Sequence, residues 1–186
     1  MERGTANETV ESGYETPPTC ILLDILLKHR HPSGPFNEVW PNIIISDART
    51  ATDLTLLNTL KVTHVVNAAH GPTHINTGFA FYSHAHIQYH GVEAPDSRDF
   101  NLSMFFQTTA DFIHTALSQD SGKVLVHCAR GVSRSATLVL AYLMIHKRLT
   151  VAEAITAVRG YRNILPNVGF LEQLRELDAR LQRKEI

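Results

Sequence analysis

The sequence predicts an α/β domain in which helices flank a central sheet of mostly parallel or mixed strands. Segments typical of strands alternate with segments typical of helices along most of the chain, a pattern that favours parallel pairing. The 186 residues are enough for one domain with a substantial core. Apolar residues form 44% of the chain and charged residues 19%, which is an ordinary globular balance.

The N-terminal residues differ from the rest. Residues 1–18 are rich in Glu, Thr, Gly and Ser and show no hydrophobic periodicity, so we expect a flexible leader. A single domain is expected over residues 19–186. It opens with a helix over residues 19–30, where apolar side chains recur at helical spacing.

The body of the chain supplies the sheet and the remaining helices. Strands are expected where short segments are rich in β-branched or aromatic residues, at residues 39–45, 63–67, 81–92 and 123–126. Helices are expected at residues 51–60, 102–117, 133–146, 150–159 and 169–181. Thr150 and Glu153 have the spacing of a capping box, which marks the start of one of these helices.

Charge and cysteine content narrow the classes of function. The formal net charge is −1 and the sequence pI is about 6.8, so neither nucleic acid nor an anionic membrane is an expected partner. The apolar stretch at 136–145 is about half of the roughly 20 residues that span a bilayer. The two cysteines, Cys20 and Cys128, form no CxxC pair and no disulfide framework. We therefore expect a reducing compartment, the cytoplasm and also the nucleus.

One loop carries the chemistry. An apolar strand ends at His127 and a strongly apolar helix begins near Ser133, so the residues from Cys128 onward must turn tightly at the carboxyl end of a strand. That edge is where α/β folds bind ligands. Consecutive backbone N–H groups in such a turn, with a helix dipole behind them, favour an anion. Gly131 gives the backbone the freedom to curl inward.

The residue types of this loop match a phosphate site with a nucleophile. Arg134 offers a planar fork that fits two phosphate oxygens. These positive groups should lower the pKa of Cys128 from about 8.5 into a range of roughly 3.5–7.5, which makes it a thiolate at neutral pH. A free cysteine alone is more often a buried structural thiol, but the surrounding pattern favours a nucleophile. The loop lacks a Lys followed by Ser or Thr, so ATP or GTP use is not expected.

A resemblance supports this interpretation. His127, Cys128, Arg134 and Ser135, with five residues between the cysteine and the arginine, resemble the signature of the protein tyrosine phosphatase superfamily. Residues 126–137 are similar to its dual-specificity branch. The likeness continues at residues 37–41, 63–69 and 166–171, and it extends over roughly residues 36–181. It is closest to the small atypical group that includes the vaccinia-H1-related phosphatase and its muscle and testis relatives. The resemblance implies the cysteine-dependent phosphatase fold.

The reaction also needs an acid, because the leaving oxygen must be protonated. The loop over residues 91–101 offers Glu93, Asp96 and Asp99, and their spacing does not choose among them. The resemblance does: members of the family place an aspartate four residues before a Phe-Asn pair, which here is Asp96. We interpret Asp99 as a charge near the start of the next helix, where it would complement the dipole.

Other positions receive supporting roles. The resemblance implies that His127 orients and polarises the loop, and Ser135 is expected to donate a hydrogen bond to the thiolate. Arg162 and Asn167 bracket a segment that packs near the pocket in the family, although Asn167 is interpreted first as a helix N-cap. Residues expected to contact the substrate are His127, Ala129, Arg130, Gly131, Val132, Ser133 and Arg134. Arg130 either meets acidic substrate flanks or is simply solvated.

The resemblance implies a protein phosphatase that hydrolyses phosphotyrosine and phosphoserine or phosphothreonine through a phosphocysteine intermediate. Phosphorylated proteins are the expected partners, with mitogen-activated protein kinases as candidate substrates. Two alternatives remain open: a phosphoinositide or RNA 5′-phosphatase, and a phosphoprotein-binding module with incidental catalysis. No cofactor is expected.

A metal site is not expected either. Six histidines lie between residues 64 and 90, and two of them, His84 and His86, are expected to share one strand face. No carboxylate or cysteine completes a plausible ligand set with them. Cys20 is expected to pack the first helix.

Overall fold

The computed structural model describes residues 13–30 and 32–183. Its elements follow one another as helices and strands that alternate along most of the chain. In order they are α1 (Thr19–Leu27), β1 (Phe36–Trp40), β2 (Ile43–Ser46), α2 (Ala48–Thr52), α3 (Leu54–Thr59), β3 (His64–Asn67), α4 (Phe79–Ser83), β4 (Gln88–Gly91), the 3₁₀ turn η1 (Ser103–Phe105), α5 (Phe106–Leu117), β5 (Val124–His127), α6 (Arg134–Lys147), α7 (Val151–Arg159) and α8 (Val168–Gln182).

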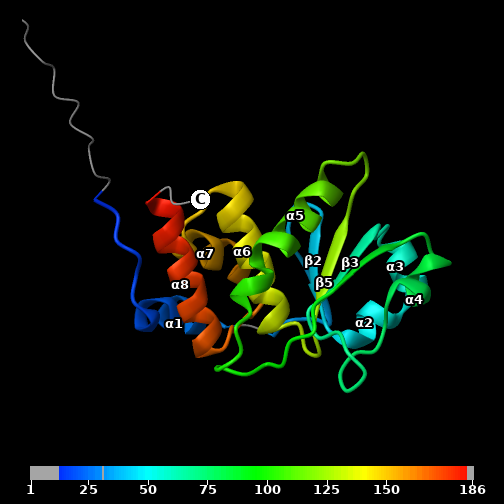
Figure 1. Cartoon of the computed structure of the whole chain (residues 1–186), viewed down its shortest axis with the longest axis horizontal. Helices are drawn as coiled ribbons and strands as arrows, with labels where there is room; N and C mark the ends of the chain where they lie inside the picture. The colour runs from blue at the N-terminus through cyan, green and yellow to red at the C-terminus, as the bar shows by residue number, and fades with distance from the viewer. Residues whose placement is uncertain (1–12, 31, 184–186) are drawn as a thin grey trace, which may run out of the picture.

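A five-stranded sheet separates two layers of helices. The strand order is β1-β2-β5-β3-β4; β1 is antiparallel to β2, and the other neighbours are parallel. Helices α1 and α5–α8 cover one side of the sheet, and α2–α4 cover the other (Figure 1). Each side has its own cluster of buried apolar side chains. The mostly parallel sheet flanked by helices is therefore confirmed.

The predicted strand at 39–45 is wrong in one respect: it is a hairpin. β1 and β2 are joined at Pro41 and Asn42, and Asn42 adopts a left-handed conformation with φ 63°. Its backbone N–H donates to Glu38 Oε1 at 2.9 Å. Asparagine tolerates this conformation better than most residues, so it can turn the chain inside an apolar run.

The predicted strand at 81–92 is correct only in its second half. Residues 79–83 form the short helix α4, whose Tyr82 is buried and donates from its hydroxyl to Ala51 O at 2.6 Å. His84 is the C-cap of α4, and His86 has a positive φ of 56°. These two histidines therefore do not share a strand face. Within residues 13–30 and 32–183, no three His, Cys, Asp or Glu side chains are grouped so that they could hold a metal ion.

The remaining differences concern helix ends. The predicted helix at 51–60 is two helices, because Asp53 ends α2 and its carboxylate caps α3 by accepting from Leu56 N at 3.0 Å. The first helix ends at Leu27 rather than at residue 30, and the helix expected from 102 begins as η1. The capping box of Thr150 and Glu153 is confirmed. No helix in the described part of the chain combines the length and the apolar character needed to cross a membrane.

Part of the predicted leader lies against α8. Residues 1–12 are outside the described residues, while residues 13–18 have no helix or strand. Tyr14 and Thr16 both donate to Asp178 Oδ2, at 2.8 and 2.6 Å, and Val151 N donates to Asp178 Oδ1 at 2.9 Å. The fully buried carboxylate of Asp178 thus joins the segment before α1 to α7 and α8.

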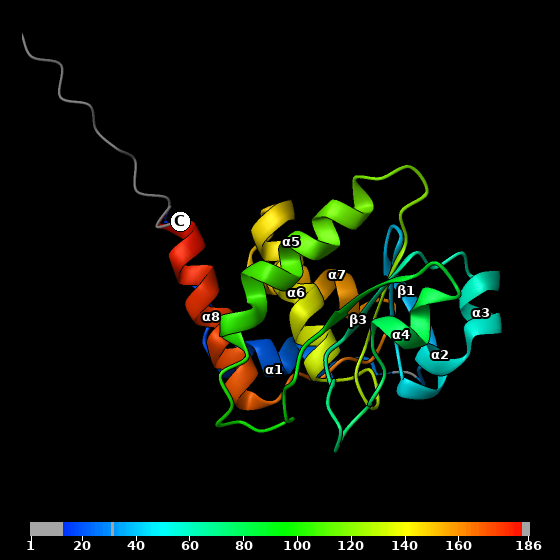
Figure 2. The same cartoon turned by 45° about the vertical axis from the view of Figure 1, so that its right-hand side comes forward.

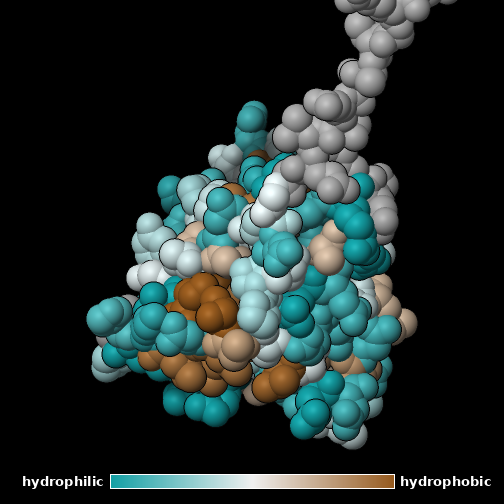
Figure 3. Space-filling model, turned by 90° about the vertical axis from the view of Figure 1, so that its left-hand side faces the viewer, coloured by the Kyte–Doolittle hydropathy of each residue, from teal (hydrophilic) through white to brown (hydrophobic). Residues whose placement is uncertain are grey.

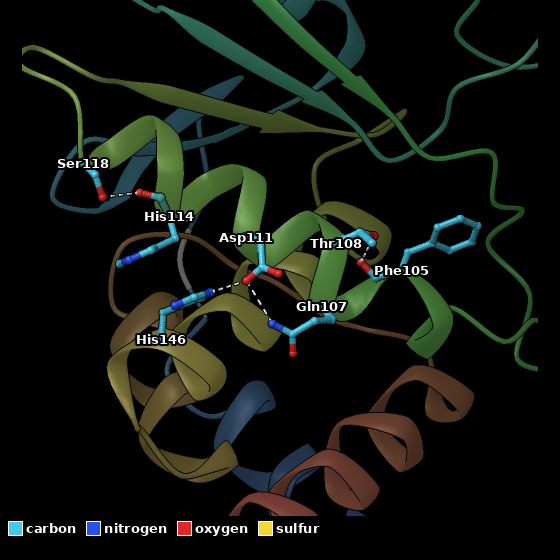
Figure 4. A network of polar contacts seen from close by, with 7 residues as sticks. All are labelled: Phe105, Gln107, Thr108, Asp111, His114, Ser118 and His146. Carbon is cyan, nitrogen blue, oxygen red and sulfur yellow. Dashed lines mark hydrogen bonds and ion pairs between the residues drawn. The ribbon is translucent and has the colours of Figure 1, made fainter. Parts of the chain in front are cut away.

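A polar contact links α5 to α6 at the outer surface (Figure 4). Asp111 Oδ1 accepts hydrogen bonds from Gln107 Nε2 at 2.9 Å and from His146 Nε2 at 2.8 Å. The rings of His114 and His146 stack with centroids 4.2 Å apart. Because Asp111 is exposed, this contact contributes little to stability compared with the buried α5–α6 interface.

Substitution of Asp178 by alanine should destabilise the fold. It leaves the buried N–H of Val151 and the hydroxyls of Tyr14 and Thr16 without their acceptor, so we expect the free energy of unfolding to fall by about 2–4 kcal/mol. Chemical denaturation of the purified chain measures this change. Glu176→Ala, at an exposed position of the same helix, is the control and should change the free energy by less than about 0.5 kcal/mol. Equal effects of the two substitutions would contradict the role given to Asp178.

Candidate active site

The loop between β5 and α6 has its carbonyl groups turned outward. Every carbonyl from Cys128 to Ser133 accepts a hydrogen bond from a group behind the loop. The pairs are His127 Nδ1 with Cys128 O at 3.2 Å, Ala48 N with Ala129 O at 3.1 Å, Arg162 Nη2 with Arg130 O at 3.2 Å, Arg162 Nε with Gly131 O at 2.7 Å, Leu165 N with Val132 O at 2.8 Å, and Thr137 N with Ser133 O at 2.9 Å. With the carbonyls satisfied on that side, backbone N–H groups on the other side hydrogen-bond to the thiol, those of Gly131, Val132 and Ser135.

Gly131 is required by this geometry. Its φ is 67°, a backbone conformation that residues other than glycine rarely adopt. A Cβ at this position would also overlap the carbonyl oxygen of Ser46 at the end of β2. The N–H of Gly131 then donates to Cys128 Sγ at 3.2 Å.

Arg162 holds the loop from behind. It is only 3% exposed, and besides the two loop carbonyls its Nη1 donates to Gly34 O at 2.8 Å and to Asn37 Oδ1 at 2.7 Å. Burial lowers the pKa of its guanidinium, an effect that the charges of Asp47 and Cys128 oppose. Arg162 was expected near the pocket. It holds the carbonyls of the loop from behind and does not line the pocket that contains Cys128.

The environment of Cys128 favours the thiolate. The side chain is 2% exposed, and burial by itself would raise its pKa. That effect is outweighed by hydrogen bonds from the side chain and backbone of Ser135 and from the Val132 backbone, together with the charge of Arg134, so the pKa of Cys128 lies below its ordinary value. The Ser135 hydroxyl lies 3.3 Å from Sγ. Since a thiolate can only accept, Ser135 is the donor to it.

Arg134 lies at the first position of α6 and is aimed into the pocket. Its Nη1 donates to Ala94 O at 3.0 Å, a backbone group of the loop after β4. Its Nε is buried and has no partner among the described residues. The pocket has a volume of about 460 Å³ and is lined by Cys128, Arg134 and Asp96 together with residues of both loops. An unpaired guanidinium N–H beside a thiolate is arranged to bind an oxyanion.

Asp96 is brought to this pocket by two contacts. Its Oδ1 accepts from Ser133 Oγ at 2.8 Å and from Asn167 Nδ2 at 2.9 Å. Asn167 also caps α8, because its Oδ1 accepts from Phe170 N at 3.0 Å. The expected N-cap is thus present, and the same side chain also holds the carboxylate.

The other two acids of the loop are elsewhere. Glu93 and Asp99 do not line the pocket, and the side chain of Asp99 is 91% exposed. Asp99 lies four residues before η1, so it is near the start of the next helix but outside its first turn. Asn101 is the residue whose side chain accepts from Ser103 N, at 3.1 Å.

His127 is a buried neutral ring. Burial lowers its pKa to about 4, and the backbone hydrogen bond to Cys128 offsets only part of that effect. Because Cys128 O can only accept, Nδ1 carries the proton, and Nε2 is buried without a partner among the described residues. The side chain supports the loop and does not line the pocket.

The lining of the pocket also includes apolar side chains and a second arginine. Leu23 of α1, Leu165, Pro166 and Val168 line it, and so does the exposed Arg130 of the loop between β5 and α6. The face that carries α1 and α8 shows apolar side chains at its surface (Figure 3). In α1, the side chains of Ile21 and Leu27 are exposed. The sequence predicted α1 as a helix but gave no sign that Leu23 would reach the pocket, because that contact depends on how α1 packs.

Comparison with known proteins identifies the fold family. Residues 43–180 match the family described as dual specificity phosphatase, catalytic domain. The chain belongs to this family. It is 46% identical to human dual specificity protein phosphatase 13B over 99% of this chain and 94% of that protein.

Solved structures agree with the family. The crystal structure of human DUSP28 is 28% identical, with a TM-score of 0.70, and the match covers 81% of this chain and 97% of that one. Human tyrosine phosphatase-like serine/threonine/tyrosine-interacting protein is 30% identical, with a TM-score of 0.69, over 78% of this chain and 97% of that one. The chain therefore has the fold of the small atypical dual specificity phosphatases and is a protein phosphatase.

The lowered pKa of Cys128 predicts its reactivity. A group with a depressed acid pKa stays deprotonated to lower pH, so alkylation by iodoacetamide at pH 6 should be faster at Cys128 than at Cys20, which is exposed. Mass spectrometry of the two cysteine peptides measures both rates in one sample. Inorganic phosphate should protect Cys128 and leave Cys20 unaffected. Slower labelling of Cys128 at pH 6, with no protection, would contradict an activated thiolate.

Proposed function

We propose that Cys128 is the nucleophile, Arg134 the phosphate-binding residue and Asp96 the general acid of this protein phosphatase. The observation that supports the assignment most directly is that Cys128, Arg134 and Asp96 line one pocket, and that the buried Nε of Arg134 has no partner among the described residues. A phosphoryl dianion bound there would meet the guanidinium and the loop N–H groups together.

In the first step, Cys128 Sγ attacks phosphorus. The S–P bond forms as the bond between phosphorus and the substrate oxygen breaks, and Asp96 gives its proton to that leaving oxygen. The products are a dephosphorylated tyrosine, serine or threonine hydroxyl and a phosphocysteine. Ser133 and Asn167, which both donate to Asp96 Oδ1, leave the other carboxyl oxygen to carry the proton.

In the second step, a water molecule attacks phosphorus and the S–P bond breaks. Asp96, now ionised, takes the proton of the water, and inorganic phosphate leaves. The electron pair returns to Cys128 Sγ, where the Ser135 hydroxyl and the N–H of Gly131 stabilise the thiolate. Arg134 and the loop N–H groups bind the phosphoryl oxygens in both steps.

The substrate within the class of phosphoproteins is a separate part of the proposal. We propose mitogen-activated protein kinases as candidate substrates, and the cytoplasm or nucleus as the place where this phosphatase acts. The lining of the pocket supports a protein substrate, because the apolar Leu165 and Val168 and the charged Arg130 are available to contact residues that flank the phosphorylated side chain. Arg130 would then favour acidic flanks.

Cys128→Ser tests the covalent mechanism. The serine hydroxyl is not ionised at neutral pH, so we expect hydrolysis of aryl phosphates to fall below detection while vanadate or phosphate still binds. Turnover kinetics and binding calorimetry measure the two properties separately. Full hydrolysis by a verified Cys128→Ser preparation would show that the phosphocysteine step is absent.

Asp96→Asn tests the general acid through the leaving group. Phenyl phosphate needs a proton on its leaving oxygen, so kcat/KM should fall roughly 10²-fold or more, whereas dinitrophenyl phosphate has a much more acidic leaving group and should lose far less. The control, Asp99→Asn, should leave both rates nearly unchanged. If Asp99→Asn carried the leaving-group effect instead, the acid would be reassigned.

A further inference from the structure

The acid loop, residues 92–102, is the segment between β4 and η1 that carries Asp96. Between Gly91 and Ser103 it contains no helix or strand. The side chains of Arg98 and Asp99 are 77% and 91% exposed, and their ion pair is 4.0 Å long. An exposed pair of this kind contributes little to stability. The buried side chains of Val92, Ala94 and Leu102 anchor the two ends of the loop in the core, so the exposed stretch between them depends on contacts to its backbone.

Arg134 of α6 contacts the backbone at Ala94, and the long-range contacts to the backbone of residues 100–103 come from α8. Gln173 uses its whole amide group: Oε1 accepts from Leu102 N at 2.8 Å and from Ser103 N at 2.9 Å, and Nε2 donates to Phe100 O at 2.8 Å. A single side chain thus satisfies three backbone groups that follow Asp96 by four to seven residues. Figures 1 and 2 show the loop passing beside the first turns of α8.

Gly169 lies one helical turn before Gln173 on the same face. A Cβ at Gly169 would overlap the carbonyl oxygen of Arg98 and lie 2.7 Å from its carbonyl carbon and 2.8 Å from its Cα. The atoms it would meet are backbone, which cannot rotate away as a flexible side chain could. Glycine in a helix costs up to about 1 kcal/mol relative to alanine, so its presence here is explained by the close approach of the acid loop.

We infer that Gly169 and Gln173 are positioning residues for Asp96. Together with Asn167, the N-cap residue that contacts the carboxylate itself, they let the N-terminal part of α8 fix both the side chain of Asp96 and the backbone of the acid loop. The inference rests on the proposed function, because Asp96 must be the acid for its position to affect the rate. Displacement of a reacting group by about 1 Å can cost on the order of 10²-fold in rate.

The test compares two leaving groups in two pairs of variants. Gly169→Ala and Gln173→Met should lower kcat/KM for phenyl phosphate by roughly 10- to 100-fold and change that for dinitrophenyl phosphate by less than about threefold. The affinity for vanadate and the alkylation rate of Cys128 should stay at wild-type values, since both depend on the other loop. Thermal unfolding establishes that each variant is folded.

Matched controls are available on the same scaffold. Gly160 at the end of α7 has its nearest atom 3.5 Å from an added Cβ, so Gly160→Ala meets only ordinary contacts. Gln182 is exposed at the end of α8, and Gln182→Met removes an amide far from the acid loop. Both controls should keep the wild-type ratio of the two rates. If the folded Gly169→Ala and Gln173→Met proteins also keep it, or lose activity equally on both substrates, the inference is overturned.

Amide hydrogen exchange separates this inference from the proposed function. Residues 97–103 should exchange at least about tenfold faster in Gly169→Ala and Gln173→Met than in the controls, whether or not the protein turns over phosphate. Absence of turnover in the wild type, or full turnover by Cys128→Ser, would refute the proposed function. The exchange measurement would then decide the positioning role alone, and unchanged exchange would refute it.

Discussion

The outward orientation of six consecutive carbonyl groups is the constraint on which the site depends. A peptide unit that turns its N–H toward a thiolate must turn its C=O away from it, and a buried carbonyl without a donor costs about 1–3 kcal/mol. The fold supplies a donor for each carbonyl from residue 128 to 133, from β5, α2, α6 and the segment that contains Arg162 and Leu165. With those six groups satisfied, the N–H groups offer their full electrostatic effect to Cys128 and to an anion.

The parallel sheet explains why two loops far apart in sequence meet. In the register of the strands, His127 at the end of β5 is level with Asn67 of β3, which is level with Gly91 of β4. The loop after β5, which carries Cys128, and the acid loop after β4 therefore leave the sheet at the same edge, two strands apart. Two helices contact these loops. The N-terminus of α6 follows the loop that carries Cys128, and α8 packs against the acid loop. Ser133 and Asn167 connect the two by hydrogen bonds to Asp96.

The sequence predicted the features that arise from neighbouring residues and missed those that depend on contacts between distant segments. The strand, tight loop and apolar helix around Cys128 are contiguous, so their pattern indicated an anion site directly. The β1–β2 turn was hidden because Asn42 sits between two apolar segments, and α4 was hidden because its aromatic residues also suit a strand. Gln173 carried no signal, since it acts through hydrogen bonds to residues 70 and more positions away. Its contact with the acid loop arises only from the way α8 packs.

His127 shows that the positive charge near Cys128 does not come from the residue that precedes it. A charged imidazole at His127 would add a positive group beside the thiolate, yet burial keeps the ring neutral at neutral pH, with a pKa of about 4. Its contribution is the Nδ1 proton that satisfies Cys128 O. The positive potential at the sulfur therefore comes from Arg134 and from oriented peptide dipoles, whose direction does not change with pH. A chain with a formal net charge of −1 can thus lower the pKa of Cys128, because the stabilising groups are backbone N–H dipoles, the Ser135 hydroxyl and one guanidinium.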